Sequence, residues 1–181
     1  MLIRFADDFL LGFTNKDDAI RVLQVLPRRL GKYGLTLHPE KTRLIALTAG
    51  KKQPDHTFDF LGFTHYMSTS RKGKAILKRK TSSKKMSASL KRMDEWIKEN
   101  RHIGVKELIV RLNQKLRGYY GYYGITFNRR KLNSYYEQTK RKLHKWLNRR
   151  GGKQRWDWKK VIQFTTEWIP LLKAKIYHGY V

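Results

Sequence analysis

The chain has 181 residues, 40% of them hydrophobic, which suits one ordinary globular domain or two small ones and excludes a disordered tail. It contains no cysteine, so disulfides, thiolate zinc sites and cysteine nucleophiles are excluded. No apolar stretch approaches the ~20 residues of a membrane span and no signal peptide is visible, so no membrane partner is expected.

The net charge of +27 is concentrated in the second part of the chain. Residues 1–70 contain ten basic and seven acidic side chains, whereas residues 71–181 contain thirty-one and seven. Fifteen of the 23 aromatic residues also lie in this second part. Basic side chains interleaved with aromatic ones suit a polyanion whose bases stack, so nucleic acid is the expected partner.

A pair of adjacent carboxylates lies near the start of the chain, between two apolar runs of strand length. Residues 2–5 and 9–11 are strand formers, and Ala6-Asp7-Asp8 is a short connection, which predicts a β-hairpin with Asp7 and Asp8 at its tip. Aspartate is a common turn residue, and that alone would explain an isolated pair. Adjacent carboxylates also suit shared cations, which offset their mutual repulsion.

A helix, then short strands, follow the hairpin. Thr14 or Asn15 is a suitable N-cap, and Pro27 is expected to kink the helix or end its regular part before Gly31. Short strands are predicted at 43–47 and 58–64. A hairpin partner is predicted to begin near residue 66 and to resume at 75–77.

The hydrophobic period changes from two to 3.6 near residue 80, and the basic stretch 78–85 is predicted to join the two regions. Four helical stripes follow, and each predicts a core-facing surface. They comprise Met86, Leu90, Met93 and Ile97; Val105, Leu108, Ile109, Leu112 and Leu116; Leu132, Tyr136, Thr139, Leu143 and Trp146; and Val161, Ile162, Thr165, Trp168 and Ile169. The expected domains are 1–79 and 80–181.

The order of three motifs in the first part resembles that of reverse transcriptases. Phe5-Ala6-Asp7-Asp8 resembles their tyrosine-alanine-aspartate-aspartate box. Residues 34–42 look like the loop after the palm helix, and residues 58–63 look like the strand pair that grips the primer. Phe5 departs from the family's tyrosine, which removes one hydroxyl near the primer end.

The second part resembles the maturase-specific region of group II intron proteins. Residues 112–118 are similar to its leucine-asparagine-proline-x-leucine-arginine-glycine segment, with Gln114 in place of the proline and Tyr119 in place of the tryptophan that follows. Trp156, Trp158 and residues 169–178 look like the end of such proteins. The resemblance implies an α+β fold, a partial antiparallel palm followed by a helical thumb and maturase region.

The resemblance also implies roles for individual residues. Asp7 would bridge two Mg²⁺ ions and Asp8 would be an auxiliary ligand. Lys41 matches a candidate proton donor to pyrophosphate, although a solvated charge is an equal alternative. Phe5, Leu61 and Gly62 would contact the primer. The expected RNA-binding residues are Arg117, Tyr120, Tyr122, Arg129, Arg130, Lys131, Lys140, Arg141 and Lys142, and helical spacing predicts that Tyr119 and Tyr123 are buried instead.

The implied function is that of a group II intron RNA-directed DNA polymerase that also assists splicing. Its expected partners are intron RNA, an RNA template, a DNA primer and deoxynucleotides. Its expected location is the bacterial cytoplasm, with association with the nucleoid as an open alternative. The family's third carboxylate and its fingers find no match here. We therefore expect a carboxy-terminal part that needs a missing amino-terminal portion and is inactive alone. A non-catalytic maturase remnant is the alternative; a retron or diversity-generating enzyme is disfavoured by residues 112–124.

Overall fold

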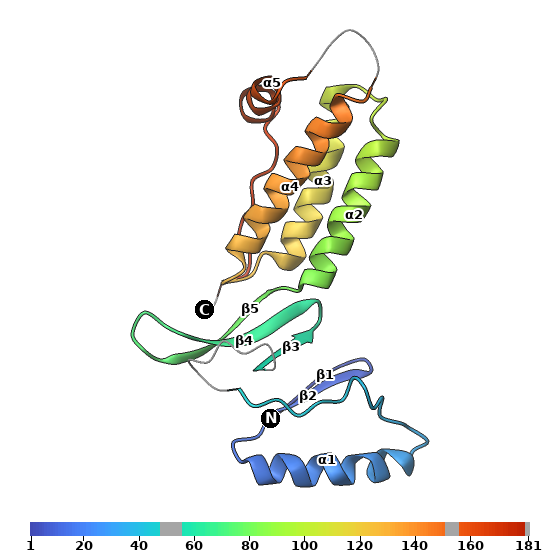
Figure 1. Cartoon of the computed structure of the whole chain (residues 1–181), viewed down its shortest axis with the longest axis vertical. Helices are drawn as coiled ribbons and strands as arrows, with labels where there is room; N and C mark the ends of the chain where they lie inside the picture. The colour runs from blue at the N-terminus through green and yellow to red at the C-terminus, as the bar shows by residue number, and fades with distance from the viewer. Residues whose placement is uncertain (48–55, 151–155, 180–181) are drawn as a thin grey trace. The chain divides into compact units, whose positions relative to one another are not determined.

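The computed structural model of the chain describes residues 1–47, 56–150 and 156–179. Its fold is α+β, as expected, with two small sheets and a set of helices (Figure 1). The chain forms two compact units, one of Met1–Phe60 with Tyr66–Ile76 and the other of Leu61–His65 with Leu77–Val181. The domain boundary at residues 79 and 80 stays a prediction.

The first unit begins with the expected hairpin and helix. Strands β1 (Leu2–Phe5) and β2 (Asp8–Leu11) pair antiparallel, and helix α1 (Lys16–Gly31) follows. The side chain of Asn15 caps this helix by accepting a hydrogen bond from the backbone N–H of Asp17 at 2.8 Å. Pro27 does not end α1, which continues for one more turn to Gly31.

The strand predicted at 43–47 is wrong, because these residues have no regular secondary structure. A strand is stabilised by the hydrogen bonds of a neighbouring strand, and the two sheets of the described chain include no partner for this segment. The segment that follows, residues 48–55, includes a turn predicted from the sequence at 51–54 and lies outside the described residues.

The second sheet has the order β3-β4-β5, formed by Thr57–Phe60, Phe63–Thr69 and Ala75–Thr81. A single strand over 58–64 is therefore wrong: Leu61 and Gly62 have φ angles of 50° and 79° and form a turn within it. Residues 78–85 do not form the predicted separate linker between the two regions. Strand β5 continues to Thr81, and Ser82 directly caps the next helix. The hairpin partner, expected near residue 66, begins at Phe63.

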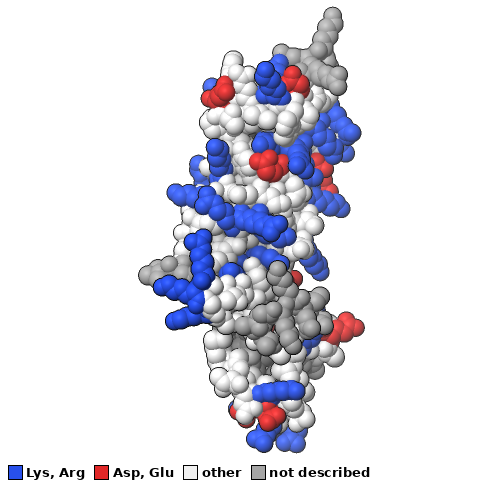
Figure 2. Space-filling view, turned by 60° about the vertical axis from the view of Figure 1, so that its left-hand side comes forward, with Lys and Arg blue, Asp and Glu red and all other residues white. Residues whose placement is uncertain are grey.

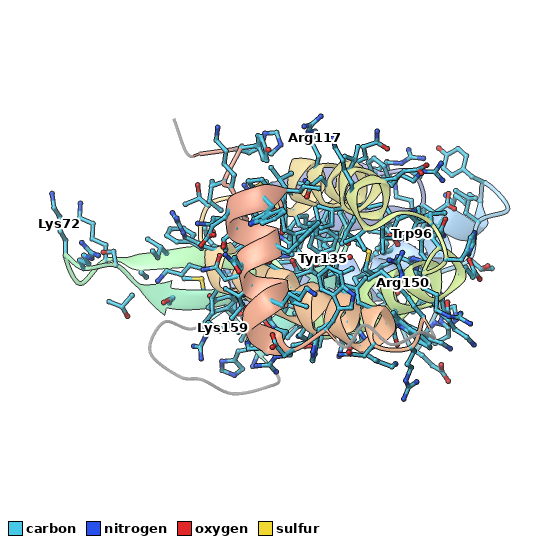
Figure 3. All side chains as sticks on the ribbon, turned by 90° about the horizontal axis from the view of Figure 1, so that it is seen from above. Lys72, Trp96, Arg117, Tyr135, Arg150 and Lys159 are labelled. Atoms are coloured by element: carbon cyan, nitrogen blue, oxygen red, sulfur yellow. The ribbon has the colours of Figure 1, made fainter. Side chains whose placement is uncertain are left out.

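Three helices of the second unit enclose its core, as the hydrophobic stripes predict. Helices α2 (Ser83–Glu99), α3 (Val105–Tyr123) and α4 (Arg129–Leu147) lie side by side, and consecutive helices run in opposite directions (Figure 1). The first three stripes are buried, apart from partly buried Val105. Tyr135, which the stripes did not include, lies in the interior of this bundle (Figure 3).

The fourth stripe is only partly correct. Helix α5 (Trp158–Gln163) runs into a π-helical turn, η2 (Phe164–Trp168). Val161 and Thr165 are buried, whereas Ile162 and Trp168 are 38% and 71% exposed. A π-helical turn has more residues than an α-helical one, so it rotates the following side chains away from the face that a 3.6-residue period predicts.

The segment after η2 returns along α3. Its residue Leu172 donates its backbone N–H to Asn113 Oδ1 at 2.7 Å, and Tyr177 donates to the carbonyl oxygen of Gly124 at 2.7 Å. Leu171 is buried in the bundle core. The carboxy-terminal segment is therefore part of the helical unit.

A buried asparagine joins β5, α3 and α4. Asn128 is fully buried, and its Oδ1 accepts the backbone N–H of Thr81 at 2.9 Å. Its Nδ2 donates to Thr81 Oγ1 and to the carbonyl oxygen of Tyr123, both at 2.8 Å. Three hydrogen bonds in a buried site fix where the strand enters and where α3 ends.

Replacing Asn128 by alanine should lower the free energy of unfolding by about 2–4 kcal/mol, because it removes three hydrogen bonds and leaves the buried backbone N–H of Thr81 without its partner. Urea denaturation followed by circular dichroism measures this change. Asn133→Ala, on the exposed face of the same helix, is the matched control and should change the free energy by less than about 0.5 kcal/mol. Equal effects of the two changes would contradict the role given to Asn128.

Candidate functional site

Asp7 and Asp8 lie at the tip of the β1–β2 hairpin, as expected. Phe5 pairs with Asp8 across the hairpin, so Ala6 and Asp7 form a two-residue connection. Ala6 has a φ of 50°, and its carbonyl oxygen accepts a hydrogen bond from Arg4 Nε at 3.0 Å. Both aspartates are exposed, and the hairpin thus presents two carboxylates to solvent at its apex.

The two carboxylates suit Mg²⁺ by type, because this ion prefers hard oxygen ligands and keeps several waters. They do not make a complete two-metal centre by themselves. Within residues 1–47, 56–150 and 156–179, no three acidic, histidine or cysteine side chains come close enough to hold a metal ion. The described residues therefore offer two carboxylates that could hold part of a metal centre, and no catalytic step through a metal is derived from them.

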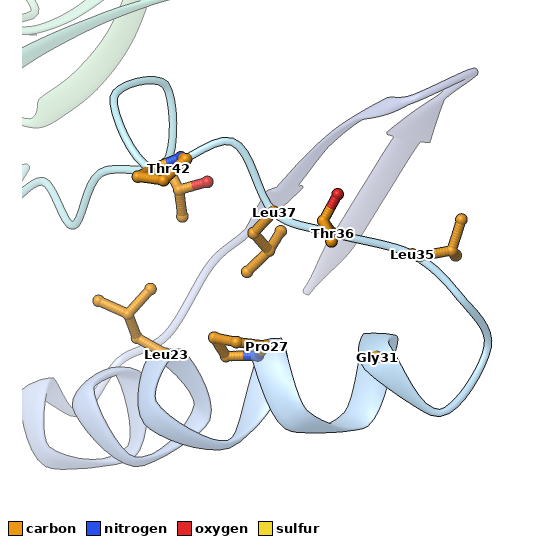
Figure 4. A pocket seen from close by; sticks show the side chains of 8 residues that line it. Leu23, Pro27, Gly31, Leu35, Thr36, Leu37 and Thr42 are labelled. Carbon is orange, nitrogen blue, oxygen red and sulfur yellow. The ribbon is translucent and has the colours of Figure 1, made fainter.

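Lys41 is exposed in a turn after α1, where its backbone N–H donates to the carbonyl oxygen of His38 at 3.2 Å. The segment around it folds back over α1 and lines an open cavity of about 480 Å³ (Figure 4). The lining is mostly aliphatic, with Leu23, Leu35 and Leu37 among its residues. Such a surface has no charged group for a phosphate, and the proton-donor role of Lys41 stays a prediction.

The turn of Leu61 and Gly62 lies against the end of α3. A Cβ atom added to Gly62 would lie 3.2 Å from the hydroxyl oxygen of Tyr123, and the φ of +79° disfavours any side chain there. Glycine is thus required by the turn itself, whatever approaches it from outside. Phe5, the third expected primer contact, is 61% exposed and belongs to the other compact unit.

The tyrosines at the end of α3 divide differently from the prediction. Tyr120 is fully buried, whereas Tyr119 and Tyr123 are only partly buried. The face of Leu112 and Leu116 continues at i+4 to Tyr120, which explains the difference. A ring enclosed in the core has no free face for a base, so Tyr120 is wrong as an RNA-stacking residue. Tyr122 is 54% exposed, as expected.

Tyr119, Tyr120 and Tyr135 form a packed aromatic cluster. The rings of Tyr119 and Tyr135 are stacked, with centroids 3.6 Å apart and planes inclined by 6°. Burial raises the pKa of Tyr135 to about 12 and raises those of Tyr119 and Tyr120 further. These hydroxyls therefore stay protonated at any physiological pH and serve packing rather than proton transfer.

Comparison with protein families assigns the two parts of the chain separately. Residues 1–65 match the reverse transcriptase (RNA-dependent DNA polymerase) family, and residues 84–163 match the maturase-specific domain of group II introns. The chain belongs to the group II intron reverse transcriptase/maturase family. No curated protein matches the sequence.

The reverse transcriptase match includes the Asp7–Asp8 hairpin and the Leu61–Gly62 turn, and the maturase match includes the tyrosines of α3 and the whole of α4. This assigns the carboxylates to the polymerase part and most of the basic charge to the maturase part. Among the described residues, no helix is both long and apolar enough to cross a membrane.

The reverse transcriptase/maturase chain presents many basic side chains along its helical part. Lys and Arg are spread over the face in Figure 2, with few acidic groups between them. Arg117 points outward in Figure 3, and Arg129, Arg130 and Arg141 are exposed. These four arginines are available to a phosphate backbone.

Two of the expected RNA-binding lysines have partners within the protein. Lys140 Nζ lies 3.0 Å from a carboxylate oxygen of Glu137, and Lys142 Nζ lies 3.5 Å from Asp94 Oδ2. Lys131 is half-buried near the start of α4. The 129–131 cluster is therefore freer to meet a phosphate than the 140–142 cluster, a difference that sequence spacing does not show.

A further basic cluster, which the sequence did not predict, surrounds Trp146. Four cationic side chains from the ends of α2 and α4 have charged groups 4.5–5.9 Å from the centre of its indole ring: Lys98, Arg101, Lys145 and Arg149. Arg150 donates to the carbonyl oxygens of Arg101 and Ile103. Basic residues in or just after the last turns of α2 and α4 were the available signal. They come together only because α2 and α4 run in the same direction, so their carboxy-terminal ends lie at the same end of the bundle (Figure 1).

Asp94 is the acidic partner within this cluster. Its carboxylate accepts Trp146 Nε1–H at 2.7 Å and an N–H of Lys145 at 3.2 Å. Partial burial alone would raise the pKa of Asp94, but these hydrogen bonds and the charges of Lys142 and Lys145 hold it below its usual value. The charged carboxylate thus ties α2 to α4.

Proposed function

We propose that the chain supplies the Asp7–Asp8 hairpin and the primer-contacting turn of an RNA-directed DNA polymerase, and that its helical unit binds intron RNA and the template–primer. The observation that carries this proposal is the exposed carboxylate pair at the hairpin tip, in a chain whose residues 71–181 contain thirty-one basic and seven acidic side chains. A carboxylate pair suits metal-assisted phosphoryl transfer, and the basic unit suits the polyanionic substrate.

Two Mg²⁺ ions are the proposed cofactor, with Asp7 as the shared ligand and Asp8 as the auxiliary one. When bound, the ions would activate the primer hydroxyl and stabilise the leaving pyrophosphate. Since two carboxylates leave such a centre short of ligands, an amino-terminal portion of the polymerase, in the same or another polypeptide, completes it in this proposal. That portion would also hold the deoxynucleotide.

RNA binding without synthesis is the second candidate function. It is favoured by the helical unit, which has a hydrophobic core of its own and the larger share of the positive charge. In this case the chain would act as a splicing cofactor that stabilises folded intron RNA. A location in the bacterial cytoplasm stays a prediction under either function.

RNA binding should show a steep dependence on salt. Each neutralised phosphate contributes roughly 0.7–0.9 to the slope of log affinity against log salt, so a surface that contacts several phosphates should give a slope of about −4 or steeper. Fluorescence anisotropy with a labelled structured intron RNA, between about 50 and 300 mM salt, measures it. A nearly flat titration would contradict the proposed interface.

Charge reversal locates the interface. Arg129→Glu with Arg130→Glu should weaken binding of all RNAs alike by at least about tenfold, because phosphate contacts carry no sequence information. Arg28→Glu with Arg29→Glu makes the same charge change at exposed positions of α1 and is the matched control. An equal loss in both variants would show that total charge, rather than the 129–131 cluster, determines affinity.

A further inference from the structure

The Leu61–Gly62 turn is held in an unfavourable backbone conformation. Both residues have positive φ, 50° for Leu61 and 79° for Gly62, and a side chain with a Cβ atom adopts this region at a cost of about 1 kcal/mol. Leucine has no polar side chain to stabilise the turn locally, so contacts from outside it must maintain this geometry.

Those contacts come from the last turn of α3. The hydroxyl of Tyr122 donates to the carbonyl oxygen of Leu61 at 2.8 Å. The ring of Tyr122 is stacked on that of Phe63, with centroids 5.7 Å apart and planes inclined by 18°. Tyr123 meets the same Phe63 ring edge-on at 5.3 Å. The turn and the first residue of β4 are thus bound to α3 by one hydrogen bond and two aromatic contacts.

The end of α3 is itself fixed. Tyr120 is fully buried, and Tyr119 is stacked on Tyr135 of α4. The carbonyl oxygen of Tyr123 accepts a hydrogen bond from buried Asn128 at 2.8 Å. On the other side, the backbone N–H of Ser82 donates to the carbonyl oxygen of Gly62 at 3.0 Å. The turn is therefore bound to a rigid support on both sides.

We infer that Tyr122 is a positioning residue that sets the shape of the primer-contacting turn from the maturase domain. Leu61 and Gly62 lie in the reverse transcriptase match and Tyr122 in the maturase match, so the maturase helix would determine how the polymerase part meets a primer. This inference rests on the proposed function, since it takes the turn as a primer contact. It also gives the Tyr122 hydroxyl a role in place of the expected contact with RNA.

Tyr122→Phe tests the inference, because it removes the hydroxyl and keeps the ring stacked on Phe63. In the whole chain, hydrogen exchange at the amide of Ser82, which bonds to Gly62, should become about fivefold faster, the size expected for one lost neutral hydrogen bond. Binding of an RNA template annealed to a DNA primer should weaken about fivefold, whereas binding of a structured RNA without primer should stay within about twofold. Tyr122→Ala should have a larger effect on the first two measurements.

Tyr33→Phe is the matched control, since it removes the same hydroxyl from a tyrosine that is 74% exposed on the other unit. It should change none of the three measurements. Unchanged exchange at Ser82 in Tyr122→Phe would overturn the inference, as would equal losses of affinity for the primed and unprimed RNA. If the wild-type chain binds neither RNA, the proposed function fails, and the exchange measurement still decides whether Tyr122 holds the turn.

Discussion

Asp7→Asn should abolish primer extension by the polymerase once an amino-terminal portion completes it, and should leave RNA binding unchanged. The substitution keeps the size of the side chain and removes its negative charge, so the hairpin folds but holds Mg²⁺ poorly. A metal ion contributes several kcal/mol to transition-state stabilisation, and a loss of about 3 kcal/mol already lowers the rate at least a hundredfold. Extension of a labelled DNA primer on an RNA template, with Mg²⁺ and deoxynucleotides, measures the effect.

The matched control is Asp17→Asn, which makes the same chemical change in the first turn of α1. That carboxylate favours the helix by at most about 1 kcal/mol, so extension should continue. Continued synthesis by the Asp7→Asn protein would remove the hairpin from the proposed catalytic centre.

The chain by itself should extend no primer, even while it binds the template. The two carboxylates at the hairpin tip would hold one Mg²⁺ weakly, and two-metal catalysis requires both ions fixed against primer and nucleotide. Adding the amino-terminal portion, fused or as a separate chain, should restore synthesis. Robust extension by the chain alone would contradict this count of ligands, and a dimer that shares an acidic residue would then be the first explanation to test.

Tyr120→Ala should lower the free energy of unfolding of the helical unit by about 3–5 kcal/mol. The ring is fully buried between α3 and α4, and its removal leaves a cavity in addition to the lost transfer free energy. Thermal and urea denaturation followed by circular dichroism measure the loss.

Tyr120→Phe separates the ring from its hydroxyl. The buried hydroxyl finds no hydrogen-bond partner in the described part of the chain, so its removal should leave stability unchanged or raise it slightly. Tyr33→Ala, at a mostly exposed position, should cost less than about 0.5 kcal/mol. A large loss in Tyr120→Phe would contradict the unpartnered state of the hydroxyl, and a small loss in Tyr120→Ala would contradict the burial of the ring.

Local patterns in the sequence predicted much of the fold. The apolar runs around Asp7 and Asp8 predicted the hairpin, and Thr14 or Asn15 as cap predicted the start of α1. Three stripes at a 3.6-residue period predicted the buried faces of α2, α3 and α4. The order of the motifs also identified the family. These features depend on residues close together in the chain, so a sequence pattern contains the information that decides them.

The failures arise where distant segments decide local structure. Residues 43–47 have strand composition but gain no partner, and Leu61 adopts a positive φ because α3 binds its carbonyl oxygen. Helical spacing allows both Tyr119, at i+3 from Leu116, and Tyr120, at i+4, to face the core, and only the structure shows that Tyr120 is the one fully enclosed.

The sequence by itself therefore determined most of the helices, the hairpin that carries Asp7 and Asp8, the excess of positive charge and the family. Only the tertiary structure decided which of the cations are free and which are paired, as Lys142 is with Asp94, and that Tyr122 holds the Leu61–Gly62 turn. The physical reason is the separation of the interacting residues along the chain. Periodicity and capping involve residues a few positions apart, whereas these hydrogen bonds and ion pairs join residues about 50 to 60 positions apart.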